Sequence, residues 1–273
     1  MTDGAAAFRA FEHARWQSAA GAYHSAFGRL TSQAAAPMLD AAQVGHGSRL
    51  LDVASGPGYV AGMGAARGAH ATGCDFAPEM VALARKHHPT ILFRVEDAER
   101  LSFHDGGFDA VTMAFLLGHL SDPDRGIRKA FRVLRPDGRF AATWWQPAER
   151  AAAFGVIMGA IRAHGRLDVP IPPGPPFDQF SDPARCHDGL TMAGFEDVRV
   201  EPLELSWRVA SGEALFDAYL HGTARTAGLL REQTPEAREA IRGAVILNSR
   251  AYQHGPDLVL PMPVWCMSGR RPD

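Results

Sequence analysis

The sequence predicts an α/β protein built on a mostly parallel sheet with helices on both faces. Between about residues 48 and 145, short apolar runs alternate with helical stretches, a pattern typical of βαβ units. The first of these runs leads into a glycine-rich turn that is followed by a helical pattern. The chain has 273 residues, of which 46% are hydrophobic and 21% charged, so its size and composition suit one large globular α/β domain.

The elements of the first half follow from apolar spacing. The first forty residues should be helical, because apolar side chains from Phe8 to Phe27 form a rough helical stripe. Five buried strands should follow, at Arg49–Val53, Ala71–Cys74, Ile91–Val95, Ala110–Ala114 and Phe140–Trp145.

The helix before the fifth strand has clear end signals. Ser121 and Asp122 can cap it, and Pro123 suits its first turn. Its apolar face should run through Leu134, and Pro136-Asp137-Gly138 should then stop it and reverse the chain.

The second half mixes helices with single strands. We expect helices at 150–166 and 183–193, an irregular six-proline loop at 168–183, strands at Val198–Val209 and Leu258–Met267, and two helices within 211–253. Thr234 should cap the second of these two helices and Pro235 should open it. The strands of residues 150–273 should complete the sheet, while the helices should cover one edge of it.

Composition argues against several classes of function. The net charge of −2 gives no electrostatic reason to expect nucleic acid or an anionic membrane as a partner. Cys74, Cys186 and Cys266 are scattered and form no CxxC pair, so neither a metal site nor a disulfide framework is expected. The first twelve residues lack a signal-peptide pattern, and no apolar run is long enough to span a bilayer. The simplest expectation is a cytoplasmic protein.

The turn at Gly56 and Gly58 carries the main chemical signal. Glycine allows backbone conformations and close approaches that a side chain would block, and the amides at a helix start favour an anionic group. Asp75 follows at the end of the next strand, where a carboxylate can accept both hydrogen bonds from a ribose diol. Together they predict a nucleoside-bearing cofactor at the carboxyl ends of parallel strands.

Two cofactors fit this turn. Residues 56–61 also satisfy the G-x-G-x-x-A fingerprint of NAD-binding proteins. Asp52, however, lies just before the glycines, where a carboxylate would repel a pyrophosphate but could engage an ammonium group. Asp97 follows the third strand and could meet an adenine amino group. Neither Lys86 nor Lys129 has the tyrosine four residues earlier that a short-chain reductase would need.

These residues resemble class I methyltransferases that use S-adenosylmethionine (SAM), and among them the branch of quinone-biosynthesis and small-molecule enzymes with a methyltransferase type 11-like domain. The resemblance covers roughly residues 45–145. It is carried by Leu51-Asp52-Val53-Ala54-Ser55-Gly56-Pro57-Gly58, Gly73-Cys74-Asp75-Phe76-Ala77-Pro78-Glu79-Met80, Glu96-Asp97-Ala98, His119-Leu120-Ser121-Asp122-Pro123 and Leu134-Arg135-Pro136-Asp137-Gly138.

The resemblance implies a Rossmann-like, seven-stranded, mostly parallel sheet whose last strand is antiparallel, with an inserted helical lid. We therefore expect an N-terminal helical cap at 1–45 and a SAM-binding methyltransferase domain at 46–273, with lid segments at 150–183 and 211–256.

The resemblance also implies a cofactor site, with S-adenosylhomocysteine as the product. Asp52 would hold the amino-acid end of SAM, Asp75 the ribose, and Asp97 with the amide of Ala98 the adenine. The methionine part would lie over the turn formed by Ala54, Ser55, Gly56 and Gly58, and the nucleoside would pack against Phe76 and Met80. Ala54 departs from the glycine usual at its position, but one added methyl should leave binding intact.

Three further residues are candidates near the reaction. His119 follows the fourth strand and could act as a base in its neutral form, or it could simply pack at a helix start. Phe115 could line the cofactor pocket or belong to the core. Tyr23 could close over the cofactor, as tyrosines of related enzymes do, or have only a packing role.

The leading hypothesis is methyl transfer from SAM to a small, partly apolar metabolite, with a carbon, nitrogen or oxygen acceptor atom left open. The rivals are an NAD-dependent oxidoreductase, a non-catalytic SAM-binding protein, and a SAM-dependent lyase or isomerase on the same scaffold. The expected partner is the small-molecule acceptor, and a homodimer remains an open option.

Overall fold

The computed structural model describes residues 3–273, which form two compact units. The sheet unit comprises Thr31–Trp145, Gly174–Leu203 and Val264–Asp273. The helical unit comprises residues 3–30, 146–173 and 204–263. Residues 31–45, which the sequence assigns to the N-terminal cap, thus pack within the sheet unit.

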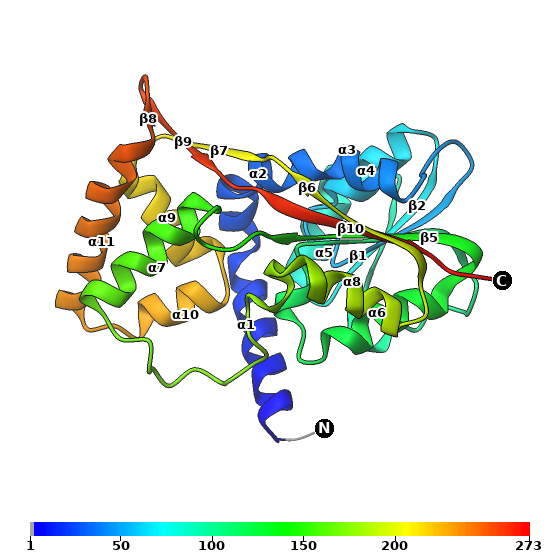
Figure 1. Ribbon diagram of the computed structural model, residues 1–273, viewed down its shortest axis with the longest axis horizontal. Helices are drawn as coiled ribbons and strands as arrows, with labels where there is room; N and C mark the ends of the chain where they lie inside the picture. The colour runs from blue at the N-terminus through cyan, green and yellow to red at the C-terminus, as the bar shows by residue number, and fades with distance from the viewer. Residues whose placement is uncertain (1–2) are drawn as a thin grey trace. The chain divides into compact units, whose positions relative to one another are not determined.

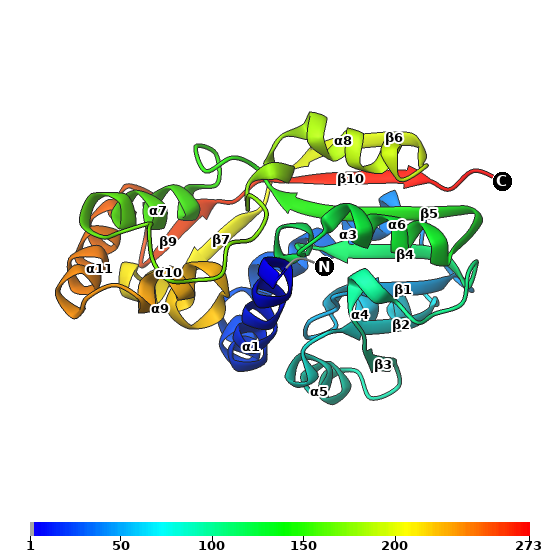
Figure 2. The same ribbon diagram turned by 90° about the horizontal axis from the view of Figure 1, so that it is seen from below.

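The sheet unit is built on a seven-stranded sheet in the order β3-β2-β1-β4-β5-β10-β6. Figure 1 shows this sheet from one side, and Figure 2, seen from another side, labels its strands one after another. The strands are β1 (Arg49–Val53), β2 (His70–Asp75), β3 (Leu92–Val95), β4 (Phe108–Ala114), β5 (Leu134–Trp145), β6 (Glu196–Leu203) and β10 (Val264–Arg270). Strand β10 runs antiparallel to both β5 and β6, and the pairs from β3 through β5 are parallel. This confirms the predicted Rossmann-like fold class, including the antiparallel last strand.

Helices lie on both faces of this sheet. Its helical segments are η1 (Ser32–Ala34), α3 (Ala35–Ala41), α4 (Tyr59–Ala66), α5 (Pro78–His87), η2 (Ala98–Arg100), η3 (Leu117–His119), α6 (Pro123–Val133), η4 (Gln179–Ser181) and α8 (Pro183–Met192), and α2 (Gly28–Thr31) leads into them. Ala141 of β5 packs on α3, whereas its neighbour Phe140 stacks on Phe195, which in turn contacts Phe131 of α6. Because successive strand residues point to opposite faces, α3 and α6 cover different sides of the sheet.

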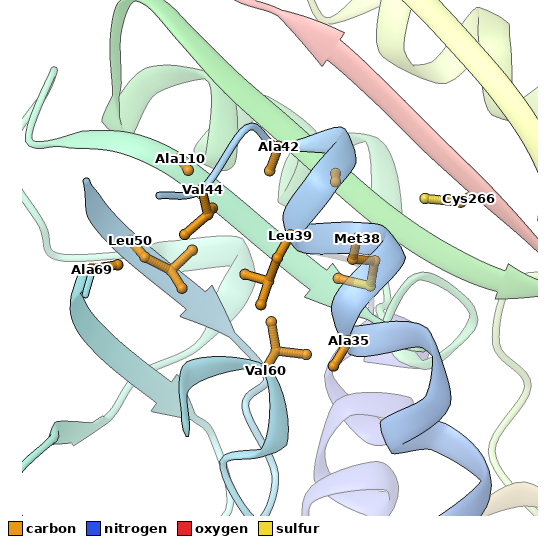
Figure 3. Close-up of a cluster of buried hydrophobic side chains, with 11 residues drawn as sticks. Ala35, Met38, Leu39, Ala42, Val44, Leu50, Val60, Ala69, Ala110 and Cys266 are labelled. Carbon is orange, nitrogen blue, oxygen red and sulfur yellow. The ribbon is translucent and has the colours of Figure 1, made fainter. Parts of the chain in front are cut away.

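Figure 3 shows the core on the α3 side. Met38 and Leu39 of α3 pack against Leu50 of β1 and Val60 of α4, and all four side chains are buried. Burying a side chain of this size contributes about 1.5–3 kcal/mol. The contact fixes the direction in which α4 leaves the glycine turn.

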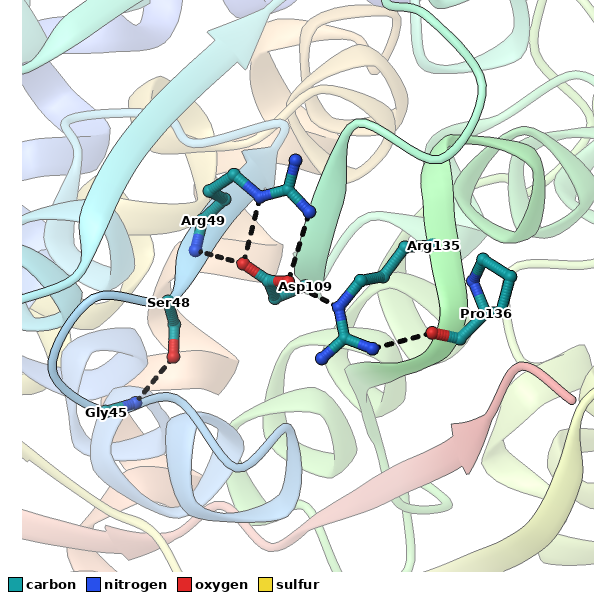
Figure 4. A network of polar contacts seen from close by, with 6 residues as sticks. All are labelled: Gly45, Ser48, Arg49, Asp109, Arg135 and Pro136. Atoms are coloured by element: carbon teal, nitrogen blue, oxygen red, sulfur yellow. Dashed lines mark hydrogen bonds and ion pairs between the residues drawn. The ribbon is translucent and has the colours of Figure 1, made fainter. Parts of the chain in front are cut away.

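A charged network connects the amino ends of β1, β4 and β5, at the opposite end of these strands from the glycine turn (Figure 4). The Asp109 carboxylate accepts hydrogen bonds from the Arg49 backbone (2.7 Å) and from the Arg49 and Arg135 side chains. These donors, led by the Arg49 side chain, hold the pKa of Asp109 well below its usual value. The network therefore links β1, β4 and β5 by charge as well as by their ladders.

The helical unit contains five α-helices, one short 3-10 turn and a small sheet within its described residues. They are α1 (Asp3–Ala26), α7 (Ala152–His164), α9 (Gly212–Gly222), α10 (Arg225–Arg231), α11 (Pro235–Ser249), η5 (Arg250–Tyr252), β7 (Ser206–Val209), β8 (Gln253–His254) and β9 (Asp257–Pro261). The small sheet is antiparallel in the order β7-β9-β8. No described helix has both the length and the hydropathy that crossing a bilayer requires.

Two expected strands were wrong in extent. The strand expected at Val198–Val209 breaks into β6 and β7, and the strand expected at Leu258–Met267 breaks into β9 and β10. Strands β7 and β9 therefore pair with each other and do not complete the main sheet. Pro263 lacks the amide hydrogen that would continue the ladder, so the second break falls beside it.

Two expected helix boundaries were also wrong. Residues 211–253 hold three helices, because Thr223 is extended and its hydroxyl accepts a hydrogen bond from the Ala227 amide (3.1 Å) at the start of α10. Leu134 begins β5, where it pairs with Phe108, so α6 ends at Val133. The predicted caps at Asp122 and Thr234 are confirmed.

Candidate functional site

The candidate site lies in the sheet unit, at the carboxyl ends of β1, β2 and β4. The chain adds β2 and β3 on one side of β1, and β4 and β5 on the other. Such a switch in strand order opens a crevice beyond the strand ends, where α/β proteins bind ligands. The turn between β1 and α4 occupies this position.

The two glycines of the turn have different roles. Both have positive φ angles, +49° at Gly56 and +88° at Gly58. An added Cβ at Gly58 would approach His88 to 2.8 Å and Phe93 to 3.0 Å, so packing requires glycine there. An added Cβ at Gly56 would meet nothing closer than the Met80 sulfur at 4.0 Å, so its surface stays open beside Met80.

Ala54 adopts a left-handed conformation, with φ of +56°. From the sequence, the methyl group of Ala54 is expected to leave cofactor binding intact. The left-handed conformation nevertheless costs a non-glycine residue about 1–2 kcal/mol. Strained residues of this kind cluster at functional sites. Phe115, which directly follows β4, has the same feature with φ of +55°. Two strained residues thus follow the paired strands β1 and β4.

Replacing Ala54 with glycine should stabilise the protein by about 0.5–1 kcal/mol, because the relief of strain exceeds the greater backbone entropy of glycine. Chemical denaturation would measure the change. Ala42→Gly is the matched control: its φ is −82°, so glycine should lower stability there. Equal losses in both variants would contradict the strain at Ala54.

Asp75 shapes the turn from the end of β2. Its buried carboxylate accepts hydrogen bonds from the Gly56 amide (2.9 Å) and the Ala77 amide (3.0 Å). A carboxylate offers about four acceptor positions in all, so these two amide bonds do not by themselves exclude a diol. Gly56 and Asp75, which are 19 residues apart in the sequence, are therefore hydrogen-bonded to each other in the turn.

Asp52 lies deeper than the sequence suggests. Its side chain, 1% exposed, accepts hydrogen bonds from the Ala61 amide (3.1 Å) and the Thr112 hydroxyl (3.0 Å). Burial raises the pKa of Asp52 to about 7, despite the opposing effect of the hydrogen bonds from Thr112 and Ala61. The carboxylate thus joins β1, β4 and α4 beneath the turn.

The third strand end carries Asp97, Ala98 and an acid that the sequence analysis missed. Asp97 is half-buried and caps η2 by accepting a hydrogen bond from the Glu99 amide (2.8 Å), and Ala98 is buried beside it. The Glu99 carboxylate, 2% exposed, accepts hydrogen bonds from the amide and hydroxyl of Ser121, both at 2.7 Å. Glu99 therefore fastens η2 to the segment after η3. No spacing signal in the sequence distinguishes it from a surface acid.

His119 ends η3 in a ring cluster of the sheet unit. Its half-buried ring lies edge-on to Trp144 (5.7 Å between centroids) and to Phe177 (5.5 Å). The Trp144 indole donates a hydrogen bond to the Phe177 carbonyl (3.1 Å), which fixes the end of the proline-rich loop at this ring. Gly118 makes room for the indole, because a Cβ there would lie 2.1 Å from Trp144. The imidazole is therefore held in a defined orientation.

The other candidates are divided between the units. Phe115 is buried and packs on Trp145 at 4.4 Å, while Phe76 is half-buried after β2. Tyr23 belongs to α1 of the helical unit, where it stacks on Phe27 at 5.8 Å. A role of Tyr23 at the cofactor remains a prediction.

The residues of the turn fit a SAM nucleoside. Besides the open Gly56 and the acceptor capacity of Asp75, the buried Ser55 hydroxyl has no hydrogen-bond partner among the described residues. A buried polar group of this kind costs about 1–3 kcal/mol unless a partner arrives, so it favours a polar ligand in the turn. Among residues 3–273, no cluster of three His, Cys, Asp or Glu side chains could hold a metal ion.

Comparisons with known proteins point the same way. Residues 51–142 match the model of a family described as a methyltransferase domain. Over 121 residues, the chain is 39% identical to a demethylmenaquinone methyltransferase of Beutenbergia cavernae, covering 42% of this chain and 50% of that protein. The chain thus spans about half the length of the curated relatives it matches.

Solved structures show likeness in fold. One is a phosphoethanolamine N-methyltransferase of Haemonchus contortus, in complex with phosphomonomethylethanolamine and S-adenosylhomocysteine (TM-score 0.60, 18% identity, covering 97% of this chain and 60% of that one). Another is the [4+2]-cyclase SpnF (TM-score 0.54, 21% identity, covering 88% and 80%). Since a cyclase shares the fold, the fold alone does not fix the reaction.

Proposed function

We propose that this chain transfers a methyl group from SAM to a small, partly apolar metabolite. The premise is that residues 51–142, which match a methyltransferase family, are a class I SAM-dependent methyltransferase domain. The observation that carries the proposal is the turn after β1. There an open glycine, a buried hydroxyl without a partner and the carboxylate of Asp75 lie together at a topological switch point. The family match selects SAM over NAD for this turn.

Each residue of the turn has a proposed part in binding. Asp75 accepts the two ribose hydroxyls, Gly56 and Ser55 lie under the methionine part, and Ala54 and Gly58 set the course of the backbone. Asp52 acts through its buried charge, because its side chain is 1% exposed and lies beneath the turn, bonded to Ala61 and Thr112.

The nucleoside would meet the second and third strand ends. Asp97 and the amide of Ala98 take the adenine, which packs against Phe76 and Met80, while Phe115 and Tyr23 cover the cofactor. For Asp97 and Ala98, the support is the turn at η2, which Glu99 fastens in place. For Met80, it is the position of the sulfur beside open Gly56.

The cofactor supplies an activated methyl group when bound, so the chain need only orient the acceptor, exclude water and receive any proton that the acceptor loses. His119 is the proposed base for that proton. Its ring is held against Trp144 and Phe177, as a positioned base requires.

We expect His119→Gln to lower kcat about tenfold, which is less than the usual loss of roughly 100-fold or more for a base, because the sulfonium is already activated. The affinity for S-adenosylhomocysteine should not change. Steady-state rates and calorimetry would measure these quantities, with His187→Gln, an exposed histidine of α8, as control. An unchanged kcat would limit His119 to packing.

The acceptor is proposed to resemble the one in the relative's name, demethylmenaquinone, in being small and partly apolar. The lack of a nucleic-acid partner is proposed from the net charge of −2. A cytoplasmic setting is proposed because the first twelve residues carry no signal-peptide pattern. A homodimer is left open. The helical lid is proposed within residues 150–183 and 211–256.

Mass spectrometry of the ligand that copurifies with the protein tests the proposal most directly. We expect SAM or S-adenosylhomocysteine, and a product 14 Da heavier than its acceptor when extracts are incubated with SAM. Retained NAD, with turnover visible at 340 nm, would replace the proposal by an oxidoreductase. Tight SAM binding without turnover on any extract would favour a non-catalytic SAM-binding protein.

A further inference from the structure

Three glycines of the sheet unit leave room for two rings. They are Gly58 and Gly62, at the start of α4, and Gly73 of β2. A Cβ added at Gly73 would overlap the ring of Phe93, a buried residue of β3. A Cβ added at Gly62 would lie 2.8 Å from both ring nitrogens of His88. Both rings also border Gly58, and we call His88 and Phe93 together the ring wedge.

Local structure fixes the ring wedge in this place. Pro89 follows His88, and a residue before proline disfavours helical angles, so α5 ends just before His88. The His88 carbonyl then accepts a hydrogen bond from the Ile91 amide (3.0 Å). The Phe93 carbonyl accepts one from the Arg85 guanidinium (2.6 Å), which joins the last turn of α5 to β3. The segment that carries both rings is therefore held at both of its ends.

The His88 ring covers the first turn of α4. The Gly62 amide donates a hydrogen bond to the Gly58 carbonyl (2.8 Å), and Gly58 offers no side chain to cap the helix. Burial, and after it the neighbouring His87, lowers the pKa of His88, so the imidazole is neutral at pH 7. A neutral ring packs there without placing a positive charge beside the amides that begin the helix.

Helix stability alone does not explain the glycine at position 62. Inside a helix, glycine is less stable than alanine, because its backbone loses more freedom. The ring wedge accounts for Gly62, since a larger residue would take the space of the His88 ring. The wedge also reaches the glycine turn, because the amide of Gly58, which both rings border, donates a hydrogen bond to the Ser55 carbonyl (2.8 Å).

We propose that His88 is a positioning residue for SAM: as part of the ring wedge, it holds the start of α4 and the glycine turn in the arrangement that binds the cofactor. His88 acts through Gly58 and Gly62 and does not touch the cofactor itself. The inference rests on the proposed function, in which SAM is the ligand of this turn.

Replacing His88 with alanine tests the role in binding. We expect His88→Ala to weaken the binding of S-adenosylhomocysteine about five- to tenfold, because the turn is less often in its binding arrangement. The KM for SAM should rise by a similar factor while kcat at saturating SAM stays unchanged, since bound SAM holds the turn in place. A residue with only a structural role would lower the melting temperature without this division. Calorimetry, steady-state rates and thermal melting measure these quantities.

His46→Ala is the matched control for this variant. The His46 ring also packs against a glycine, because a Cβ added at Gly68 would lie 2.8 Å from it. Gly68, however, follows the carboxyl end of α4, away from the glycine turn. The control should therefore keep the wild-type affinity for S-adenosylhomocysteine.

A second set of variants tests the contact between His88 and Gly62. Gly62→Ala alone should displace the imidazole, and it should weaken the binding of S-adenosylhomocysteine about as much as His88→Ala does. The double variant should bind no more weakly than His88→Ala, because the contact is already lost. Its melting temperature should lie roughly 2–4 °C above that of His88→Ala, since alanine favours the helix. Gly62→Ala alone should not melt above the wild type.

Three results would overturn the positioning role. In the first, His88→Ala binds S-adenosylhomocysteine as tightly as His46→Ala does. In the second, kcat at saturating SAM falls as much as KM rises. In the third, the losses of affinity from His88→Ala and Gly62→Ala simply add in the double variant. A wild-type protein that does not bind S-adenosylhomocysteine would instead overturn the proposed function, and the role of His88 with it.

Discussion

Replacing Asp75 with alanine should weaken the binding of SAM roughly 100-fold, because two hydrogen bonds from the ribose to a charged group are lost, worth about 3 kcal/mol together. The same change removes the partners of the Gly56 and Ala77 amides, so the turn also loses its anchor. Titration calorimetry with SAM and with S-adenosylhomocysteine measures the effect.

Asp109→Asn is the matched control for this variant. It removes a carboxylate from the same sheet, but at the amino ends of the strands, where Arg49 and Arg135 surround it. The control should lower stability and leave cofactor affinity unchanged. If Asp75→Ala bound SAM as tightly as the control does, the ribose would not lie at Asp75.

Replacing Asp52 with asparagine should change the pH dependence of stability. Burial raises the pKa of Asp52 from 3.8 to about 7, so the folded state favours the protonated carboxyl. The resulting stabilisation is fully present below about pH 4 and is lost as pH rises through 7. A pKa shift of this size corresponds to about 4 kcal/mol in the free energy of unfolding. Asparagine does not titrate, and it can still accept from Ala61 and donate to Thr112.

Unfolding in denaturant at a series of pH values measures the difference between Asp52→Asn and the wild type. We expect the variant to gain stability relative to the wild type from pH 4 to 7, and the difference to level off above pH 7. A difference that is constant over this range would mean that Asp52 is not a titrating buried group. Calorimetry on the same samples should show weaker SAM binding by the variant than by the wild type above pH 7, because Asp52 is charged there and asparagine is not.

The parallel part of the fold could be predicted because its signals are local. The strand Arg49–Val53 is centred on the apolar pair Leu50-Leu51 and leads into the glycine turn, and the structure has it with the same bounds. The breaks near Glu204 and Pro263 could not be predicted in the same way. Apolar side chains recur on both sides of each break. Pro263 marks only a missing ladder bond, and which strand each half then pairs with is a long-range property.

The candidate site shows a similar division. Asp75 could be identified because an acid at a strand end beyond a glycine turn has a recognisable pattern. The burial of Asp52 and Glu99 could not be predicted. The local sequence around an acid in a strand or a 3-10 turn does not distinguish an exposed side chain from a buried one. The strain at Ala54 and Phe115 is a property of backbone angles, which composition does not reveal.

The order of the strands has a consequence for synthesis of the protein. Strand β6 lies at the edge of the seven-stranded sheet and pairs with β10, which also closes the free side of β5. Because translation delivers β10 after β7, β8 and β9, both strands emerge from the ribosome long before their shared neighbour. During that interval the nascent chain exposes apolar β5 residues such as Phe140 and Trp144 along an open edge, the state in which chaperones protect chains from aggregation.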